Sequence, residues 1–204
     1  MDIDEDSIAA MSFGTSLMDR EEQRFNTDCS RIADNDPRTT QFAFDNMGGV
    51  DFLLTVTNEE WEQIGRDVSN NTHLELVDCF GILSNNENGL ESFLRGLVGS
   101  TSIVDLGLEN NRISPAGVRS LVPFLQNSCK LASLGIGRNN IGSEGFNILL
   151  WALRDSQIEG LYCGGSGIES IEIERGYFPR VLKKLDLSRN NISSDGCKGI
   201  AQLL

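Results

Sequence analysis

A pattern of apolar positions recurs through the second half of the chain. Two apolar residues lie two positions apart, a small polar residue follows three positions later, and an isoleucine comes two positions after that. The copies are Leu106-x-Leu108-x-x-Asn111-x-Ile113, Leu134-x-Ile136-x-x-Asn139-x-Ile141 and Leu185-x-Leu187-x-x-Asn190-x-Ile192, with a weaker Leu161-x-Cys163-x-x-Ser166-x-Ile168. Self-similarity at such a period predicts a solenoid, in which each unit buries its apolar face only against its neighbours.

Each copy predicts a strand, a turn and a helix. Alternating apolar residues are typical of a strand. A glycine follows the asparagine by six positions in three copies: Gly117, Gly145 and Gly196. Apolar residues four and eight positions after each glycine would share one helix face. Serines supply N-cap or first-turn residues ahead of these helices: Ser114, Ser143 and Ser193. The pattern therefore predicts a parallel sheet covered by a helix layer.

The small polar residue forms a column along the repeats. With the first unit aligned on Leu74, the column reads Cys79, Asn111, Asn139, Ser166 and Asn190. An asparagine there can pair backbone groups that would otherwise be buried without hydrogen bonds. The basic unit has about 28 residues, with an insertion at residues 84–89. The unit from Ile158 is shortened and lacks its glycine, so a short turn or 3-10 piece is expected on its convex side.

The consensus LxxLxLxxNxI, followed by glycine and two helical leucines, resembles the ribonuclease-inhibitor-type leucine-rich repeat. The units that begin at Ile103 and Leu131 match it column by column, and the resemblance covers roughly residues 71–204. It implies an α/β leucine-rich-repeat solenoid, a short horseshoe arc with a parallel sheet on the concave face and helices on the convex face. The chain ends at Leu204 on a core position with no polar capping repeat, which favours a fragment of a longer protein.

Residues 1–45 predict an acidic, disordered leader. They carry 11 acidic residues against four arginines and no sustained apolar period, apart from a weak helical segment near residues 18–24. Residues 46–70 predict a capping strand–helix unit. The alternation from Val50 to Val56 predicts its strand, and Thr57 and Glu60 have the spacing of a capping box.

The charge and the cysteines exclude several classes of function. A formal charge of −13 argues against nucleic acid and anionic membrane surfaces as partners. The sequence has neither a secretory signal at its start nor a run of 18 apolar residues, so we expect an intracellular, cytoplasmic protein without a membrane span. Five cysteines without CxxC spacing predict neither disulfides nor a zinc site, and Cys79 and Cys163 are expected as buried thiols.

Candidates for catalysis are few. His73 is the only histidine and is expected to be a polar residue at a strand edge. The glycine-rich stretches at residues 135–137 and 164–167 lack the third glycine or the Gly-Lys-Ser/Thr ending of phosphate loops. The acidic residues form no calcium-loop motif. We therefore predict a protein that is not an enzyme and that holds no cofactor and no metal.

The resemblance implies that a protein partner binds on the concave sheet face, as in a scaffold or adaptor. Strand alternation nominates the contact residues, among which Tyr162 is the one exposed aromatic residue expected near the centre. The candidates are Glu75, Asp105, Glu109, Arg138, Tyr162, Lys184, Asp186 and Arg189. An alternative reading is a regulator of a small GTPase, similar to the Ran GTPase-activating proteins, or a sensor fragment similar to immune receptors.

Overall fold

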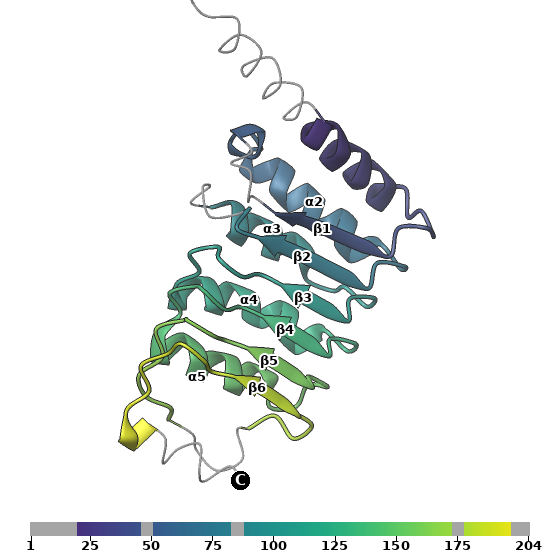
Figure 1. Cartoon of the computed structure of the whole chain (residues 1–204). Helices are drawn as coiled ribbons and strands as arrows, with labels where there is room; N and C mark the ends of the chain where they lie inside the picture. The colour runs from purple at the N-terminus through teal and green to yellow at the C-terminus, as the bar shows by residue number, and fades with distance from the viewer. Residues whose placement is uncertain (1–19, 46–50, 83–87, 173–177, 197–204) are drawn as a thin grey trace, which may run out of the picture.

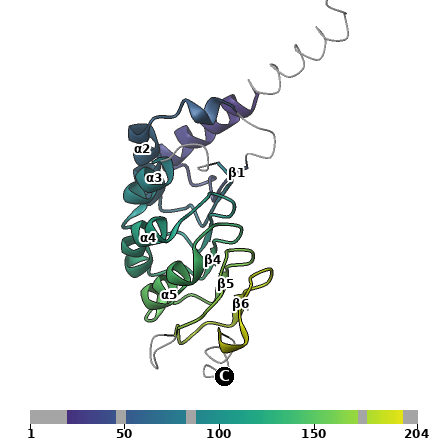
Figure 2. The same cartoon turned by 90° about the vertical axis from the view of Figure 1, so that its left-hand side faces the viewer.

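Within the described residues of the computed structural model (20–45, 51–82, 88–172 and 178–196), six strands form one parallel sheet in chain order. The strands are β1 (Gln41–Asp45), β2 (Leu76–Phe80), β3 (Asp105–Gly107), β4 (Ser133–Gly135), β5 (Gly160–Tyr162) and β6 (Lys184–Asp186). The helices are η1 (Asp51–Leu54, a 3-10 helix), α2 (Asn58–Asn70), α3 (Gly89–Leu97), α4 (Pro115–Asn127) and α5 (Gly142–Leu153). Residues 20–33 are also helical. Helices α2 to α5 cover one face of the sheet and leave the other face open (Figures 1 and 2), which confirms the predicted leucine-rich-repeat solenoid.

The leucines of adjacent strands lie side by side beneath the helices. Leu106, Leu134, Leu161 and Leu185 are direct partners across β3 to β6. The first three are fully buried and Leu185 is half-buried. Each strand therefore adds one step to a continuous core, and no unit could bury that leucine alone.

The side chains of the asparagine column form hydrogen bonds with the backbone of the preceding unit, and they pair buried backbone groups as predicted. Asn139 Oδ1 accepts hydrogen bonds from the backbone amides of Asn111 (2.8 Å) and Ile113 (3.0 Å). Its Nδ2 donates to the carbonyl oxygen of Leu108 at 2.9 Å. Buried backbone groups in the turns are thus paired without a further strand or water.

The predicted alignment of the first unit is wrong by three residues. β2 pairs Val77 with Leu106, so Val77 and Cys79 fill the two core positions of this strand, and both are fully buried. Cys79 therefore lies in a leucine column and not in the asparagine column. Leu76 faces the open side and is half-buried. The alignment is difficult to predict because Leu74-x-Leu76 has the spacing of the leucine pair of the repeat, whereas Val77 and Cys79 occupy the two core positions.

The cysteines of the described residues are free thiols, as expected. Burial raises the pKa of the Cys29 thiol to about 12, with Asp28 and Asp67 acting in the same direction. Burial likewise raises the pKa values of Cys79 and Cys163. The two residues predicted as buried thiols therefore behave as small core residues.

The prediction of a disordered leader is wrong for residues 20–45; residues 1–19 lie outside the described part. The helical segment 20–33 and β1 belong to the folded unit. The ring of Phe25 lies 5.0 Å from that of Phe44 and 6.0 Å from that of Trp61, measured between centroids. Phe25, Cys29 and Ile32 form a short apolar stripe at helical spacing, which the many acidic residues around it obscure in the sequence.

The predicted strand from Val50 to Val56 is also wrong, since residues 51–54 form η1 and residues 46–50 lie outside the described part. The sheet instead begins with β1. The capping box is confirmed: Glu60 Oε2 accepts from the amide of Thr57 at 2.8 Å, and Thr57 Oγ1 accepts from the amide of Glu60 at 3.2 Å. Helix α2 then buries Trp61 fully against the core.

The shortened unit is held differently from the others. Helix α4 is capped by Ser114, as predicted, but α5 begins at Gly142 and Ser143 lies in its first turn. Ser143 Oγ instead accepts from the amides of Glu169 (3.0 Å) and Ser170 (2.9 Å) in the next unit. Residues 163–172 and 178–183 contain no helix, in agreement with the expected short convex side. A side chain of α5 thus replaces the hydrogen bonds that a helix would supply.

A candidate binding surface on the open face of the sheet

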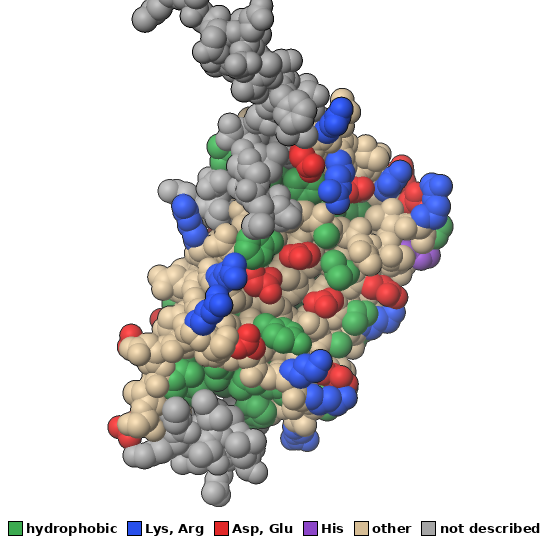
Figure 3. Space-filling view, viewed as in Figure 1, with side chains coloured by type: hydrophobic (Ala, Val, Ile, Leu, Met, Phe, Trp, Pro, Cys, Tyr) green, Lys and Arg blue, Asp and Glu red, His purple; other side chains and the backbone are tan. Residues whose placement is uncertain are grey.

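The open face of the sheet carries a different set of side chains on every strand. In the row through the last residues of β3 to β6 and the middle of β2, the residues are Asp78, Gly107, Gly135, Tyr162 and Asp186. Acidic side chains gather over the middle of this face, and basic side chains lie along its edges (Figure 3). The surface is therefore acidic at its centre.

A hollow of about 300 Å³ lies in this acidic centre. Its walls and floor come from β2 to β5 and from Glu109, directly after β3. The lining residues are Leu76, Val77, Asp78, Asp105, Gly107, Glu109, Ser133, Gly135 and Tyr162. Three of the predicted candidates, Asp105, Glu109 and Tyr162, thus come together in one site.

Glycines make room for the long side chains of the hollow. A methyl group on Gly135 would clash with Glu109 Oε1, so the carboxylate lies flat over the neighbouring strand. A methyl group on Gly107 would lie 2.8 Å from Asp78 Oδ1. The Tyr162 ring lies over Gly160 in the same way, with Cε2 3.0 Å from the place of a Cβ atom. The glycines of β3 to β5 therefore form the floor on which the acidic and aromatic side chains rest.

The environment of Glu109 disfavours the ionised form of its carboxyl group. Burial raises its pKa above the usual glutamate range, and the nearby carboxylates of Asp78 and Asp105 raise it further. Its own backbone amide and the guanidinium of Arg138 act in the opposite direction. Among the described residues, neither Glu109 nor Asp105 forms an ion pair. A cation placed in the hollow would favour the ionised form of Glu109.

Arg138 lies at the rim of the acidic centre, outside the lining of the hollow but near enough to Glu109 to lower the pKa of its carboxyl. Its guanidinium carbon is 5.9 Å from the centroid of the Phe80 ring, which is the geometry of a cation–π contact. Phe80 belongs to β2 and Arg138 to the turn after β4, so the arginine side chain reaches across the turn that follows β3. At this edge of the surface, the guanidinium of Arg138 therefore contacts an aromatic ring and interacts electrostatically with the carboxylate of Glu109.

The rim arginines occupy backbone positions that favour glycine. The residue before the asparagine column has a positive φ in every unit, and in two units it is glycine, Gly81 and Gly165. Arg138 (φ 55°) and Arg189 (φ 57°) adopt the same conformation. The left-handed region costs a non-glycine residue about 1 kcal/mol. The backbone is therefore strained at both arginines, and such strain is frequent at functional positions.

The other predicted candidates lie outside the hollow. Glu75 precedes β2 at the start of the strand and is exposed, and Lys184 is exposed on β6. Asp186 accepts a hydrogen bond from the amide of Ser188 at 2.8 Å, which lowers the pKa of its carboxyl. Leu76 and Asp78 could not be nominated from the sequence, because the sequence pattern aligns the first unit three residues away. The pairing of Leu76 with Asp105 and of Asp78 with Gly107 places both residues on the open face.

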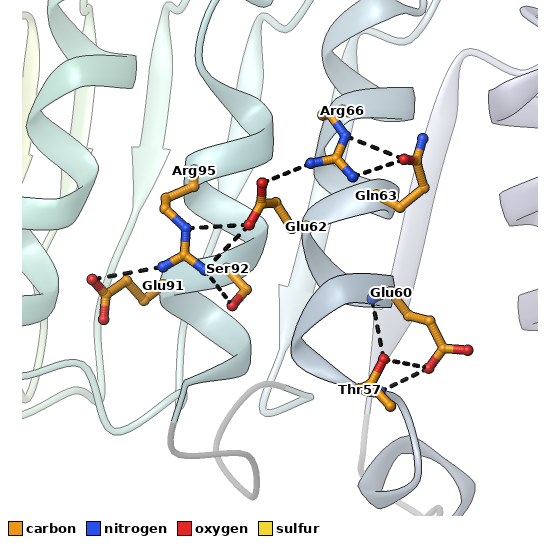
Figure 4. A network of polar contacts seen from close by, with 8 residues as sticks. All are labelled: Thr57, Glu60, Glu62, Gln63, Arg66, Glu91, Ser92 and Arg95. Atoms are coloured by element: carbon orange, nitrogen blue, oxygen red, sulfur yellow. Dashed lines mark hydrogen bonds and ion pairs between the residues drawn. The ribbon is translucent and has the colours of Figure 1, made fainter.

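A second cluster of charged residues joins α2 to α3 (Figure 4). Glu62 pairs with Arg66 of its own helix at 2.6 Å and with Arg95 of α3 at 3.2 Å. Glu91 adds a longer pair with Arg95 at 3.8 Å. These charges are mutually neutralised on the helix side, so the cluster links two helices and leaves no net charge of one sign.

A second hollow, of about 520 Å³, lies at the carboxyl ends of α4 and α5. Trp151, which is 44% exposed, and Cys129 contribute to its wall. It contains one base and one acid, Arg154 and Asp155, which pair with each other at 2.9 Å. This hollow has no charge preference comparable with that of the sheet face.

The described residues hold neither a metal-ligand cluster nor a membrane-spanning helix. No group of three or more histidine, cysteine, aspartate or glutamate residues in this part of the chain is arranged to hold a metal ion. No described helix has the length and apolar character needed to cross a membrane.

Similarities to known proteins agree with the fold. The family model described as "Leucine Rich repeat" matches residues 179–201. No curated protein matches the sequence. Among solved structures, the chain is similar to one named "Leiomodin-1 Actin-Binding Site 2 (ABS2)", with a TM-score of 0.55, 19% sequence identity, and coverage of 68% of this chain and 78% of that one. This likeness concerns the fold alone. The fold is that of a leucine-rich-repeat solenoid, and the repeat's family model matches the last unit alone.

Proposed function

We propose that the protein is a protein-interaction module that binds its partner on the open face of the sheet. The hollow over β2 to β5 carries this proposal, because it combines a glycine floor, a tyrosine and three carboxylates on an otherwise uncovered face. Aromatic residues that are part exposed and part packed are enriched at binding hot spots.

The repeat geometry supports the ribonuclease-inhibitor type within the family. Equivalent strand positions from β2 to β6 are 29, 28, 27 and 24 residues apart, and α3, α4 and α5 are α-helices. Solenoids of this kind use the inner sheet surface for extended contacts. The free thiols fit a reducing compartment, which supports a cytoplasmic location.

The similar structure is named as an actin-binding site, and this supports a protein ligand and makes actin the first partner to test. A photo-reactive benzoylphenylalanine in place of Tyr162 should cross-link the partner. The same group in place of Trp151, near the carboxyl end of α5, is the matched control. Purified actin is tested first and a cell lysate second. Adducts formed through position 151 alone would contradict binding on the sheet face.

Tyr162→Ala gives an independent measurement. The ring lies over Gly160 on the open face and not in the core, so its removal should weaken partner capture and leave the circular-dichroism spectrum and the unfolding midpoint nearly unchanged. Unchanged capture would count against this surface. Regulation of a small GTPase remains an alternative prediction. Faster GTP hydrolysis by a small GTPase in the presence of the chain would favour this function over that of a simple scaffold.

A further inference from the structure

The hollow on the open face has an unbalanced charge. Asp78, Asp105 and Glu109 all line it, and no basic residue does. Asp105 and Glu109 form no ion pair within the described residues, and half-burial leaves Glu109 poorly solvated. Such a surface is complementary to a positive group and disfavours an acidic or purely apolar one.

We propose that this hollow receives an arginine side chain of the partner protein. The inference rests on the proposed function and adds the chemistry of the central contact. The three carboxylates stand in different rows of the face, with Asp105 at the start of β3, Asp78 within β2 and Glu109 two residues after the end of β3. A guanidinium presents five donors in one plane and can reach several acceptors at once, whereas an ammonium acts as a point charge.

The wall and floor also suit a planar cation. Tyr162 offers a ring on the β5 side, and the missing Cβ atoms of Gly107 and Gly135 let the carboxylates of Asp78 and Glu109 lie along the floor. A guanidinium group can stack on an aromatic ring and pair with carboxylates in its own plane.

Arg138 provides an example of the same recognition within the chain. Its guanidinium stacks on Phe80 and attracts the carboxylate of Glu109. Arg138 does not line the hollow, whereas Tyr162 and Asp105 do, and they again provide an aromatic ring and a carboxylate. An arginine of the partner in the hollow would therefore make the same kind of contact that Arg138 makes with Phe80 and Glu109.

The test uses N-acetyl-arginine amide as the probe and N-acetyl-citrulline amide as its neutral isostere. Each is titrated into the ¹⁵N-labelled chain, and the amide signals of Gly107 and Gly135 are followed by NMR. We expect saturable shifts with the arginine compound, with a dissociation constant on the order of 1–10 mM. The citrulline compound should cause shifts at least about fivefold smaller at the same concentration, because it lacks the charge that strengthens each hydrogen bond.

Variants locate the contact. Glu109→Gln keeps the shape of the side chain and should weaken arginine binding at least about fivefold. Glu159→Gln is the matched control, because Glu159 is exposed, precedes β5 and pairs with Lys183 outside the hollow. It should leave binding unchanged. A dispersed NMR spectrum establishes that each variant is folded, and the comparison of arginine with citrulline in the unaltered chain does not depend on any variant.

Equal shifts with arginine and citrulline, the absence of shifts, or equal binding to Glu109→Gln would overturn the arginine site. These outcomes differ from failure of the proposed function. A partner cross-linked through position 162 without arginine binding would leave the interaction module intact and refute only the chemistry of its central contact.

Discussion

The two faces of the sheet obey different constraints although the same strands form them. On the helix-covered face, equivalent positions repeat one residue type, as in Leu106, Leu134 and Leu161. On the open face, one row reads aspartate, glycine, glycine, tyrosine and aspartate. The covered face must fill a continuous core of fixed spacing, so every unit needs the same shape. No described helix packs on the open face (Figures 1 and 2), so its side chains can differ from unit to unit.

The largest expected difference between the faces concerns Leu134→Ala. Leu134 is fully buried between Leu106 and Leu161, so truncation leaves a cavity that both neighbouring units border. Chemical unfolding should show a loss of about 2–5 kcal/mol in the free energy of unfolding. A loss below about 1 kcal/mol would contradict this packing, whereas Tyr162→Ala on the open face serves as the control with a small effect.

Gly65→Ala should rank next, because it acts on the covered side through the backbone. A methyl group on Gly65 would clash with the carbonyl oxygen of Phe93 and would lie 3.0 Å from the Cα atom of Gly96. Helices α2 and α3 would have to move apart, and the pair between Glu62 and Arg95 would lengthen. We expect a loss of about 1–3 kcal/mol in the free energy of unfolding, which is typical of overpacking. Unchanged stability would mean that this helix contact is loose.

Sequence reasoning succeeded where a residue's role depends on its own unit and its direct neighbour. The column of Leu106, Leu134, Leu161 and Leu185 follows from the period, and the hydrogen bonds of Asn139 follow from the need to pair buried backbone groups. It failed where long-range contacts decide. Phe25 is buried by aromatic residues distant in sequence, and the position of Asp78 depends on the pairing of β2 with β3. Tyr162, Asp105 and Glu109 could be nominated from alternation, but their meeting in one hollow depends on the absence of side chains at Gly107 and Gly135.

Gly135→Ala is the open-face counterpart of Gly65→Ala. Here the added methyl meets the end of a flexible side chain, Glu109, which can swing toward solvent. Stability should therefore change by no more than about 0.5 kcal/mol. Because the carboxylate no longer lies on the floor, binding of N-acetyl-arginine amide should nevertheless weaken. A loss of stability as large as that of Gly65→Ala would show that the floor of the hollow is as tightly packed as the core.

The smallest effect, and the one of opposite sign, is expected for Glu109→Gln. Because burial and the carboxylates of Asp78 and Asp105 raise the pKa of Glu109, with Arg138 only partly offsetting them, the folded protein binds this proton more readily than the unfolded chain. The ionised side chain therefore lowers stability at neutral pH, and this penalty disappears as the pH falls through the raised pKa.

Glutamine removes the penalty at every pH. The variant should consequently be slightly more stable than the unaltered protein at pH 7, and the two unfolding midpoints should converge as the pH enters the acidic range. Glu159→Gln, which removes an exposed carboxylate paired with Lys183, should show no such gain at pH 7. A loss of stability in Glu109→Gln at pH 7 would mean that the carboxylate already has a stabilising partner within the fold. The open face would then be balanced like the covered one, and the site for an incoming cation would lose its electrostatic basis.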